Sequence, residues 1–284
     1  MHNAINDSGQ RAMANERSDS PSAGRAGEPS GEPAGERAVT RQDTHAGRAI
    51  ERDSFAIIDA EAGAHSYTPE QWSIVRRMIH ASADFELNGL TAFHPKALVA
   101  GRAALTQGGW PLVADVGMIL AGLSAERLRR FDLHPCQFIA DADVAAAACA
   151  EGTTRAVQAM RKAHRLGLLD GAIIGIGNAP TALIELVRLI DKAGIRPALV
   201  LGMPVGFVKA AESKALLARI ESVPWIIIEG RKGGSTLVVA ALHALFALVE
   251  TGIEIGVETG IDTGIKTSVE AGLPAVADHT EAKA

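Results

Sequence analysis

The sequence predicts an α/β protein with a single doubly wound, mainly parallel five-stranded sheet and helices on both faces. Two observations support this prediction. Several apolar runs are too short for buried helices and stop at glycine-containing turns, which is typical of strands. Segments with apolar residues at helical spacing follow these runs. Continuously apolar strands that alternate with amphipathic helices indicate a parallel sheet covered on both faces.

The stretch 172–214 shows the alternation most clearly, because it holds two consecutive strand-turn-helix units. In the first unit the strand stops at Gly177, and Asn178 is expected to cap the following helix. Pro180 fits the first turn of that helix, where a missing N–H is tolerated. The second unit repeats the plan, with residues 198–201 as its strand.

The turns that follow these two strands predict a binding rim. Ligands of doubly wound sheets bind beyond the carboxyl ends of the strands. The rim is therefore expected to include Asn178 and Thr181 after the first strand, and Pro204 and Phe207 after the second.

The remaining elements follow in chain order. Thr68, Pro69 and Gln71 have the spacing of a helix start with a capping box. Asp115 ends a predicted strand and is expected to cap the next helix rather than to face a ligand. Further helices are expected over 48–62, 69–80, 96–107, 117–123, 141–151, 153–169 and 236–246, and further strands over 111–116, 137–140 and 225–228.

Composition divides the chain into three parts. Residues 1–47 are rich in Gly, Ser, Ala, Pro, Arg and Glu, and are predicted to be a disordered N-terminal extension without a secretory leader. Residues 249–284 contain a degenerate Thr-Gly-Ile repeat and are predicted to be a flexible low-complexity tail. Residues 48–248 remain as one α/β domain, within the range of a single core.

Charge and cysteine content narrow the function classes. The chain carries 28 basic and 33 acidic residues, but the acidic excess lies entirely in the two end segments, so residues 48–248 are slightly positive. The near-neutral core does not favour nucleic-acid binding, although it suits a small acidic ligand met by a few Arg residues. Two cysteines without a paired motif indicate neither disulfides nor a zinc site, and a cytoplasmic location is expected. No segment is expected to span a membrane.

Common catalytic motifs do not match. The turn 175–180 holds Pro180 at the third glycine position of a dinucleotide fingerprint, and the turn 231–235 does not fit a P-loop. The nine histidines lack metal-ligand spacing, so no metal is expected. A nucleotide-dependent enzyme of similar topology stays open as an alternative.

Two local patterns allow a functional interpretation beside a structural one. His80 ends a predicted helix, where it is either a C-terminal cap or a general acid. Thr153, Thr154 and Arg155 open another helix, which is either an ordinary cap with a surface Arg or a corner that holds an anion.

Seven sequence blocks resemble the precorrin-8X methylmutase family. The most specific are IGNAPTAL at 176–183, GMPVGFVKAAESK at 202–214 and GRKGGS at 230–235. Shorter agreements occur at 54–58, 77–81, 101–105 and 152–155. All lie in family order over about residues 48–247.

The resemblance implies an isomerase of cobalamin biosynthesis that moves a methyl group from C11 to C12 of a corrinoid tetrapyrrole, without a separate cofactor. It also implies a homodimer with active sites at the subunit interface, and leaves open whether the substrate contains cobalt. A non-catalytic corrinoid carrier of the same pathway is the alternative.

The resemblance also assigns site residues. His80 takes the position of the family histidine that protonates the ring, and substrate contacts fall on Ser54, Ser124 and Arg155. The apolar faces of the ring would suit Met203, Val205 and Phe207. Three positions depart from the family pattern: Glu51, where an aromatic residue is expected, Ser82, where cysteine is common, and Ser124, where threonine is common.

Overall fold

The computed structural model describes residues 44–258 and contains a six-stranded sheet in the order β1-β6-β5-β4-β2-β3. Five strands are parallel to one another, and β1 pairs antiparallel with β6. The predicted fold class is confirmed, but the strand count is wrong by one. The strands are β1 (Thr91–Phe93), β2 (Pro111–Ala114), β3 (His134–Cys136), β4 (Ile173–Ile176), β5 (Leu199–Gly202) and β6 (Trp225–Ile228).

The strand that the sequence analysis missed (β1) and the strand that it misplaced (β3) both lie at the edges of the sheet. β1 is only three residues long, which is too short for a periodicity signal. β3 covers His134–Cys136 instead of the predicted 137–140, although Pro135 lies at its centre. An edge strand tolerates proline because one side of its backbone needs no partner. Ile139 is instead held in a turn, where its N–H donates to the Gln137 side chain over 2.9 Å.

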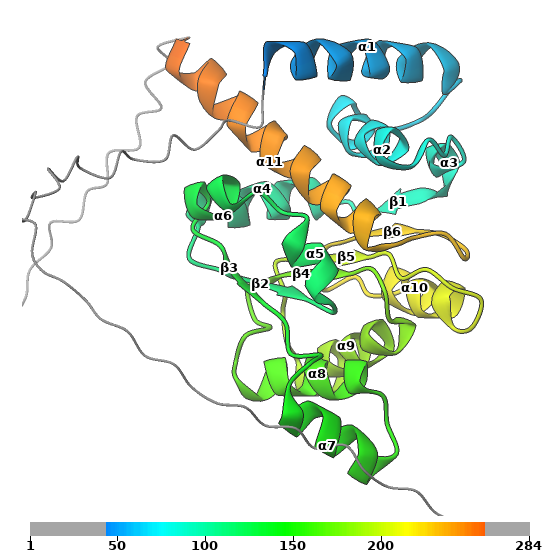
Figure 1. Cartoon of the computed structure of the whole chain (residues 1–284), viewed down its shortest axis with the longest axis vertical. Coiled ribbons are helices and arrows are strands. Elements are labelled where there is room, and N and C mark those ends of the chain that lie inside the picture. Colours follow the sequence, from blue (N-terminus) through cyan, green and yellow to red (C-terminus); the bar gives the residue numbers. More distant parts are fainter. Residues whose placement is uncertain (1–43, 259–284) are drawn as a thin grey trace, which may run out of the picture. The chain divides into compact units, whose positions relative to one another are not determined.

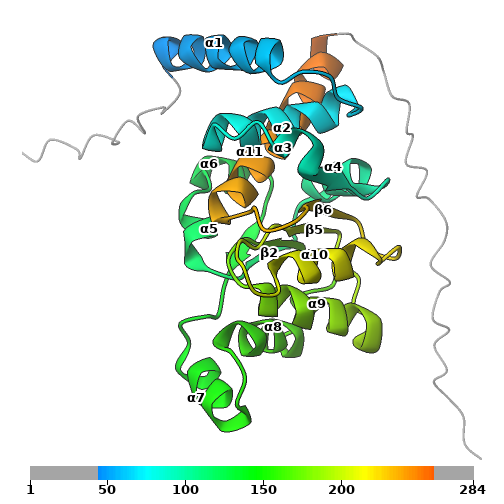
Figure 2. The same ribbon diagram turned by 90° about the vertical axis from the view of Figure 1, so that its right-hand side faces the viewer.

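Helices cover both faces of the sheet (Figures 1 and 2). They are α1 (His45–Glu61), α2 (Pro69–Ser82), α3 (Leu87–Leu90), α4 (Ala97–Gln107), α5 (Gly117–Ala121), α6 (Ala125–Arg130), α7 (Ala142–Glu151), α8 (Arg155–Arg165), α9 (Pro180–Ala193), α10 (Ala210–Ala218) and α11 (Ser235–Glu258). The predicted extension 1–47 and tail 249–284 lie largely outside the described residues. Within the described part, α1 already begins at His45 and α11 continues to Glu258.

Alternating side chains of the strands pack into two separate hydrophobic cores, one on each face of the sheet. Ile173, Leu199 and Leu201 pack with α2, α4 and α11 on one face of the sheet. Ile174 and Val200 pack with α8, α9 and α10 on the other face. This period of two on strands that are apolar throughout is what a sheet buried on both faces requires.

The central helix α11 is apolar enough to meet a length and composition test for a membrane span. Its window Ser235–Gly252 has a mean hydropathy of 1.6 over 18 residues. In the fold 56 % of that window is buried. Leu242, Leu245 and Phe246 are fully buried in the core beside α2 and the sheet, so these apolar residues serve packing within the domain.

The start of α11 packs directly against the end of β4. A Cβ atom on Gly177 would lie 2.6 Å from the Cα and 2.7 Å from the N of Ser235. Only glycine permits this close approach of two backbone segments. The contact fixes the turn after β4 relative to the first turn of α11.

We expect Gly177→Ala to lower the free energy of unfolding by about 2–3 kcal/mol, because the added methyl meets backbone atoms that cannot rotate away. Gly117→Ala is the matched control, since its Cβ would enter open space in the first turn of α5. That control should change stability by less than about 0.5 kcal/mol. Urea unfolding followed by circular dichroism measures both, and equal effects would contradict the packing argument.

Candidate functional site

The candidate site lies at the carboxyl edge of the sheet, where the loops after β2, β4, β5 and β6 meet. The antiparallel strand β1 adds a further segment to this edge. Its first residue, Thr91, pairs with Ile228 at the carboxyl end of β6, and the N–H of Glu229 donates to Leu90 O over 2.7 Å. The chain just before β1, which includes the last turn of α2, therefore ends at the same edge as the loops.

A buried carboxylate organises this edge. Asp115 follows β2, is 1 % exposed, and accepts three backbone hydrogen bonds from the loop after β4. The N–H groups of Gly177, Asn178 and Ala179 donate to it over 3.1, 2.9 and 2.7 Å. Burial raises the pKa of Asp115, and the backbone donors oppose that effect.

This arrangement corrects two capping predictions. The N-cap residue of α5 is Val116, and the Asp115 carboxylate turns to the neighbouring loop instead of capping α5. The N-cap residue of α9 is Ala179, which makes no side-chain cap, so Asn178 does not cap α9. Its side chain is exposed at the rim. No local sequence pattern indicates this pairing, because Asp115 and its partners are more than sixty residues apart.

Two helix N-termini converge beside this loop. Thr154 is the N-cap of α8 and accepts from the N–H of Val157. Its hydroxyl also lies 2.9 Å from the Thr181 hydroxyl in the first turn of α9. Arg155, the first residue of α8, is exposed next to this pair. Hydroxyl groups, helix N-termini and a guanidinium at one place suit a bound carboxylate.

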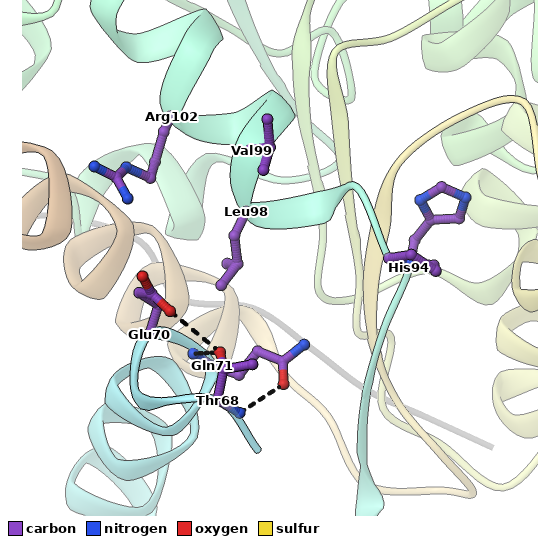
Figure 3. A pocket seen from close by; sticks show the side chains of 8 residues that line it. Thr68, Glu70, Gln71, His94, Leu98, Val99 and Arg102 are labelled. Atoms are coloured by element: carbon purple, nitrogen blue, oxygen red, sulfur yellow. Dashed lines mark hydrogen bonds between the residues drawn. The ribbon is translucent and has the colours of Figure 1, made fainter. Parts of the chain in front are cut away.

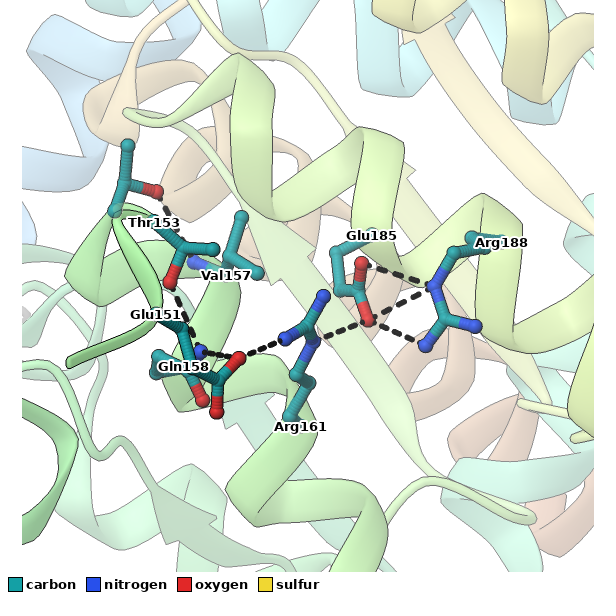
Figure 4. A network of polar contacts seen from close by, with 8 residues as sticks. Glu151, Thr153, Val157, Gln158, Arg161, Glu185 and Arg188 are labelled. Atoms are coloured by element: carbon teal, nitrogen blue, oxygen red, sulfur yellow. Dashed lines mark hydrogen bonds and ion pairs between the residues drawn. The ribbon is translucent and has the colours of Figure 1, made fainter. Parts of the chain in front are cut away.

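A polar network behind the corner fixes the turn between α7 and α8 (Figure 4). The buried Gln158 side chain donates to Glu151 over 2.8 Å and to Thr153 over 2.9 Å. Arg161 joins Glu151 to Glu185 with bonds of 2.7 and 2.9 Å. Burial alone would raise the pKa of Glu185, but hydrogen bonds from Arg188 and Arg161 outweigh it and hold that pKa below the usual value.

His80 is exposed in the last turn of α2. Its ring meets the Phe55 ring of α1 edge to face, with centroids 5.3 Å apart. Ser54, beside Phe55, is half-buried and donates to Ile50 O over 2.8 Å. The last turn of α2 thus packs against the part of α1 that carries Phe55. Glu51, at a position where an aromatic residue was expected, pairs with Arg77 of α2.

Ser124 lies on a separate element, where it is the N-cap of α6 and accepts from the N–H of Arg127. Sequence reasoning missed the network next to it. Arg127 binds Glu250 of α11 through two nitrogens and donates to His243 Nδ1 over 2.9 Å. Because arginine only donates, His243 carries its proton on Nε2, which lies 3.1 Å from Gly122 O. Burial, followed by the nearby arginines, lowers the pKa of His243.

The three apolar residues predicted to face a ligand differ in exposure. Phe207 is 86 % exposed and Val205 is 47 % exposed in the loop after β5, where a flat ring could reach them. The Arg231 guanidinium lies 5.5 Å from the centroid of the Phe207 ring. Met203 is fully buried in the core, so the prediction that it faces a ligand was wrong.

The predicted residues therefore form separate groups in one copy of the chain. One group is His80 with Phe55, the neighbour of Ser54 on α1, and another is Arg155 and Thr181, linked through Thr154. In the described part of the chain, no hydrogen bond, ion pair or ring contact joins these groups directly.

A cavity of about 340 Å³ lies elsewhere, between the start of α2 and α4 (Figure 3). It is lined in part by His94, which follows β1 at the opposite edge of the sheet, where its N–H donates to Trp225 O. Both ring nitrogens of His94 are already engaged, with Glu221 O and with the N–H of Lys96. This cavity is not part of the candidate site.

A buried lysine lies under the loops of the candidate site. Lys214 of α10 is 1 % exposed, and its ammonium donates to Lys232 O over 2.6 Å in the turn before α11. Burial lowers its pKa to about 8, from an ordinary value of 10.5. Within the described residues, no group of three or more His, Cys, Asp or Glu side chains could hold a metal ion.

This lowered pKa predicts a pH dependence of stability. Below pH 8 Lys214 is protonated in both states and the folded state bears the full cost of burying the charge. Above pH 8 the folded protein releases the proton while the unfolded chain retains it, so the cost is relieved. Relative to Lys214→Met, the free energy of unfolding of the wild type should rise by about 2 kcal/mol between pH 7 and pH 10. Urea unfolding at both pH values measures this, and a constant difference would contradict the assignment.

The fold and the rim define a doubly wound α/β protein whose loops gather polar side chains and helix N-termini at the carboxyl edge of its sheet. The model of the precorrin-8X methylmutase family matches residues 49–248. The chain therefore belongs to the precorrin-8X methylmutases, which are isomerases of cobalamin biosynthesis, and the predicted family is confirmed.

Individual relatives agree with this membership. A cobalt-precorrin-8 methylmutase of Leptospira interrogans is 50 % identical over 213 residues, which cover 73 % of this chain and 96 % of the relative. A precorrin-8X methylmutase of Pseudomonas aeruginosa is 41 % identical over 200 residues, covering 70 % and 94 %. The crystal structure of a precorrin-8X methylmutase from Thermus thermophilus has a TM-score of 0.67 at 54 % identity, covering 72 % of this chain and 97 % of that one.

Proposed function

We propose that this isomerase moves a methyl group from C11 to C12 of precorrin-8X or its cobalt form, and that His80 supplies the proton that promotes the migration. The position of His80 carries this proposal, because its exposed ring lies in the helix turn that leads to the carboxyl edge of the sheet. An exposed imidazole in that position can donate a proton to a ligand bound at this edge.

The chemistry needs few groups from the protein. The bond from C11 to the methyl group breaks while the bond from C12 forms, so the reaction requires no external nucleophile. The proton from His80 returns at the end of the cycle, since an isomerase adds no atoms. Holding the ring in a migration-ready geometry can lower much of the barrier, and a general acid can lower the rest.

The acidic arms of the macrocycle account for the rest of the rim. We infer that Arg155, with Thr181 and the N-termini of α8 and α9, binds carboxylate arms. Asn178 can donate hydrogen bonds from its exposed amide. Ser54 and Ser124 offer further hydroxyl groups, and Phe207 offers an apolar face to the ring.

We expect His80→Ala to lower kcat about 100- to 10,000-fold, the usual contribution of a general acid, while binding of the corrinoid product is retained. Conversion of precorrin-8X followed by absorbance measures turnover, and a titration with hydrogenobyrinic acid measures binding. His134→Ala is the control, because His134 is an exposed histidine at the start of β3. Full turnover by His80→Ala would contradict the proposed role of His80 as the proton donor.

We further propose that the chain is a cytoplasmic homodimer whose active sites are completed at the subunit interface. Ile50 and Ile57 of α1 are 67 % and 56 % exposed, and Ser54 lies between them at helical spacing on the same side. A partner that covers this side would bring the substrate contact Ser54 into the interface. Cys136 and Cys149 are both free, which is consistent with a reducing compartment.

A mixed dimer tests the shared site. We expect His80→Ala and Arg155→Met each to lower kcat/KM strongly as homodimers. If the two residues act in one site from different subunits, exchange between the two variants restores about a quarter of wild-type activity, because half of the dimers contain one intact site. Gel filtration at dimer size is the accompanying check. A monomer, or a dimer without recovery after exchange, would contradict the interface proposal.

A further inference from the structure

A lysine connects the turn before α11 with the end of α2. Lys232 Nζ lies 2.6 Å from an Asp84 carboxylate oxygen and 2.8 Å from a Glu86 carboxylate oxygen. These two acids belong to the short segment between α2 and α3. The connection therefore joins the exit of β6 to the helix end that carries His80, across 148 residues of sequence.

The backbone at the lysine end of this bridge is held in place. Lys232 O accepts the hydrogen bond from the buried Lys214 ammonium. On either side of it, the N–H of Gly234 donates to Met203 O over 2.8 Å and Arg231 O accepts from Gly206 over 3.1 Å. The turn is thereby fastened to α10 and to the loop after β5, so the Lys232 side chain starts from a fixed base.

The carboxylate end is tied to the last turn of α2. The N–H of Asp84 donates to Ser82 Oγ over 3.3 Å, and Ser82 Oγ donates to Met78 O over 2.9 Å. Between them Ala83 adopts a left-handed conformation with φ 53° and closes the helix on Ile79 O. Such a conformation is sterically unfavourable for alanine, so this turn needs outside support to persist. His80 lies within the same turn of the helix.

We infer that Lys232 is a positioning residue for His80: its bridge to Asp84 holds the end of α2 so that the imidazole meets the macrocycle in a reactive geometry. This inference rests on the proposed role of His80. The ion pair is half-exposed and contributes little to overall stability. A small displacement of a catalytic group, in contrast, lowers the rate strongly. The bridge should therefore matter for turnover more than for folding.

Four variants of the full chain test the bridge. Lys232→Met removes the ammonium and Lys232→Arg keeps a cation of similar reach. Asp84→Asn and Glu86→Gln each remove one carboxylate that binds Lys232. Glu86→Gln is the matched control, because the Glu86 side chain is 73 % exposed whereas that of Asp84 is 29 % exposed.

We expect Lys232→Met to lower kcat about tenfold, while KM and the Kd for hydrogenobyrinic acid change less than about twofold. Asp84→Asn should lower kcat by the same factor. The double variant Lys232→Met/Asp84→Asn should have no lower kcat than either single variant, because both changes break the same interaction. Lys232→Arg and Glu86→Gln should keep kcat within about twofold of the wild type. The melting temperature should stay within a few degrees throughout.

Three results would overturn the inference: unchanged kcat in Lys232→Met, equal losses in Asp84→Asn and Glu86→Gln, or a kcat loss accompanied by equal losses of product binding and thermal stability. The second result would indicate a general charge effect, and the third would indicate damage to the fold. His80→Ala in the same assay separates the two proposals. If His80→Ala retains turnover, the proposed role of His80 is wrong. If His80→Ala is inactive while Lys232→Met is fully active, only the positioning role of Lys232 is wrong.

Discussion

The candidate site depends on the hydrogen bonds that the Asp115 carboxylate accepts from the loop after β4. This carboxylate lies at the end of β2 and receives three backbone N–H groups of the loop after β4, so it sets the distance between two neighbouring strand exits. Hydrogen bonds to a charged acceptor contribute about 1.5–3 kcal/mol each, whereas burial of a carboxylate costs several kcal/mol. These opposing terms are similar in size. Asp115 therefore contributes position more than stability.

The position of Asp115 determines the positions of the rim residues through a series of local contacts. Ala179, which donates to Asp115, begins α9, and the first turn of α9 carries Thr181. Thr181 meets Thr154 at the start of α8, next to Arg155. The polar network behind α8 holds the same turn from the other side. The proposed carboxylate-binding corner is thus positioned by backbone donors and neighbouring helices, which leaves Arg155 free to meet a ligand.

Three buried charges near this edge show that the partner, and not burial alone, decides the pKa. Glu185 is buried between two arginines, and its pKa is lowered. Asp115 has only neutral donors, and its pKa is raised. Lys214 donates to a carbonyl oxygen, which also carries no full charge, and its pKa falls to about 8. A full opposite charge compensates for lost hydration, whereas backbone dipoles do so in part. The two groups that contact the loops of the site are those without a full opposite charge.

The sequence predicted what depends on local periodicity and missed what depends on distant pairing. The strand-turn-helix units of 172–214, the capping box at Thr68 and the parallel sheet follow from short-range patterns, and the structure confirms them. The family blocks led to His80 and Arg155, whose roles remain predictions. The contacts of Asp115, the network of Arg127 with His243, and the burial of Met203 involve partners far apart in sequence, and no local pattern encodes them.

The missed strand β1 has the largest consequence, because it decides where His80 lies. A parallel strand in its place would enter the sheet from the opposite edge and carry the end of α2 away from the loops after β2, β4 and β5. Antiparallel pairing of Thr91 with Ile228 reverses that direction and places the end of α2 at the carboxyl edge of the sheet. Three residues with little periodicity thus determine which edge receives the proposed proton donor. Since so short a strand contributes few hydrogen bonds, the side chains on either side of it, including the Lys232 bridge to Asp84, become the means by which that placement is held.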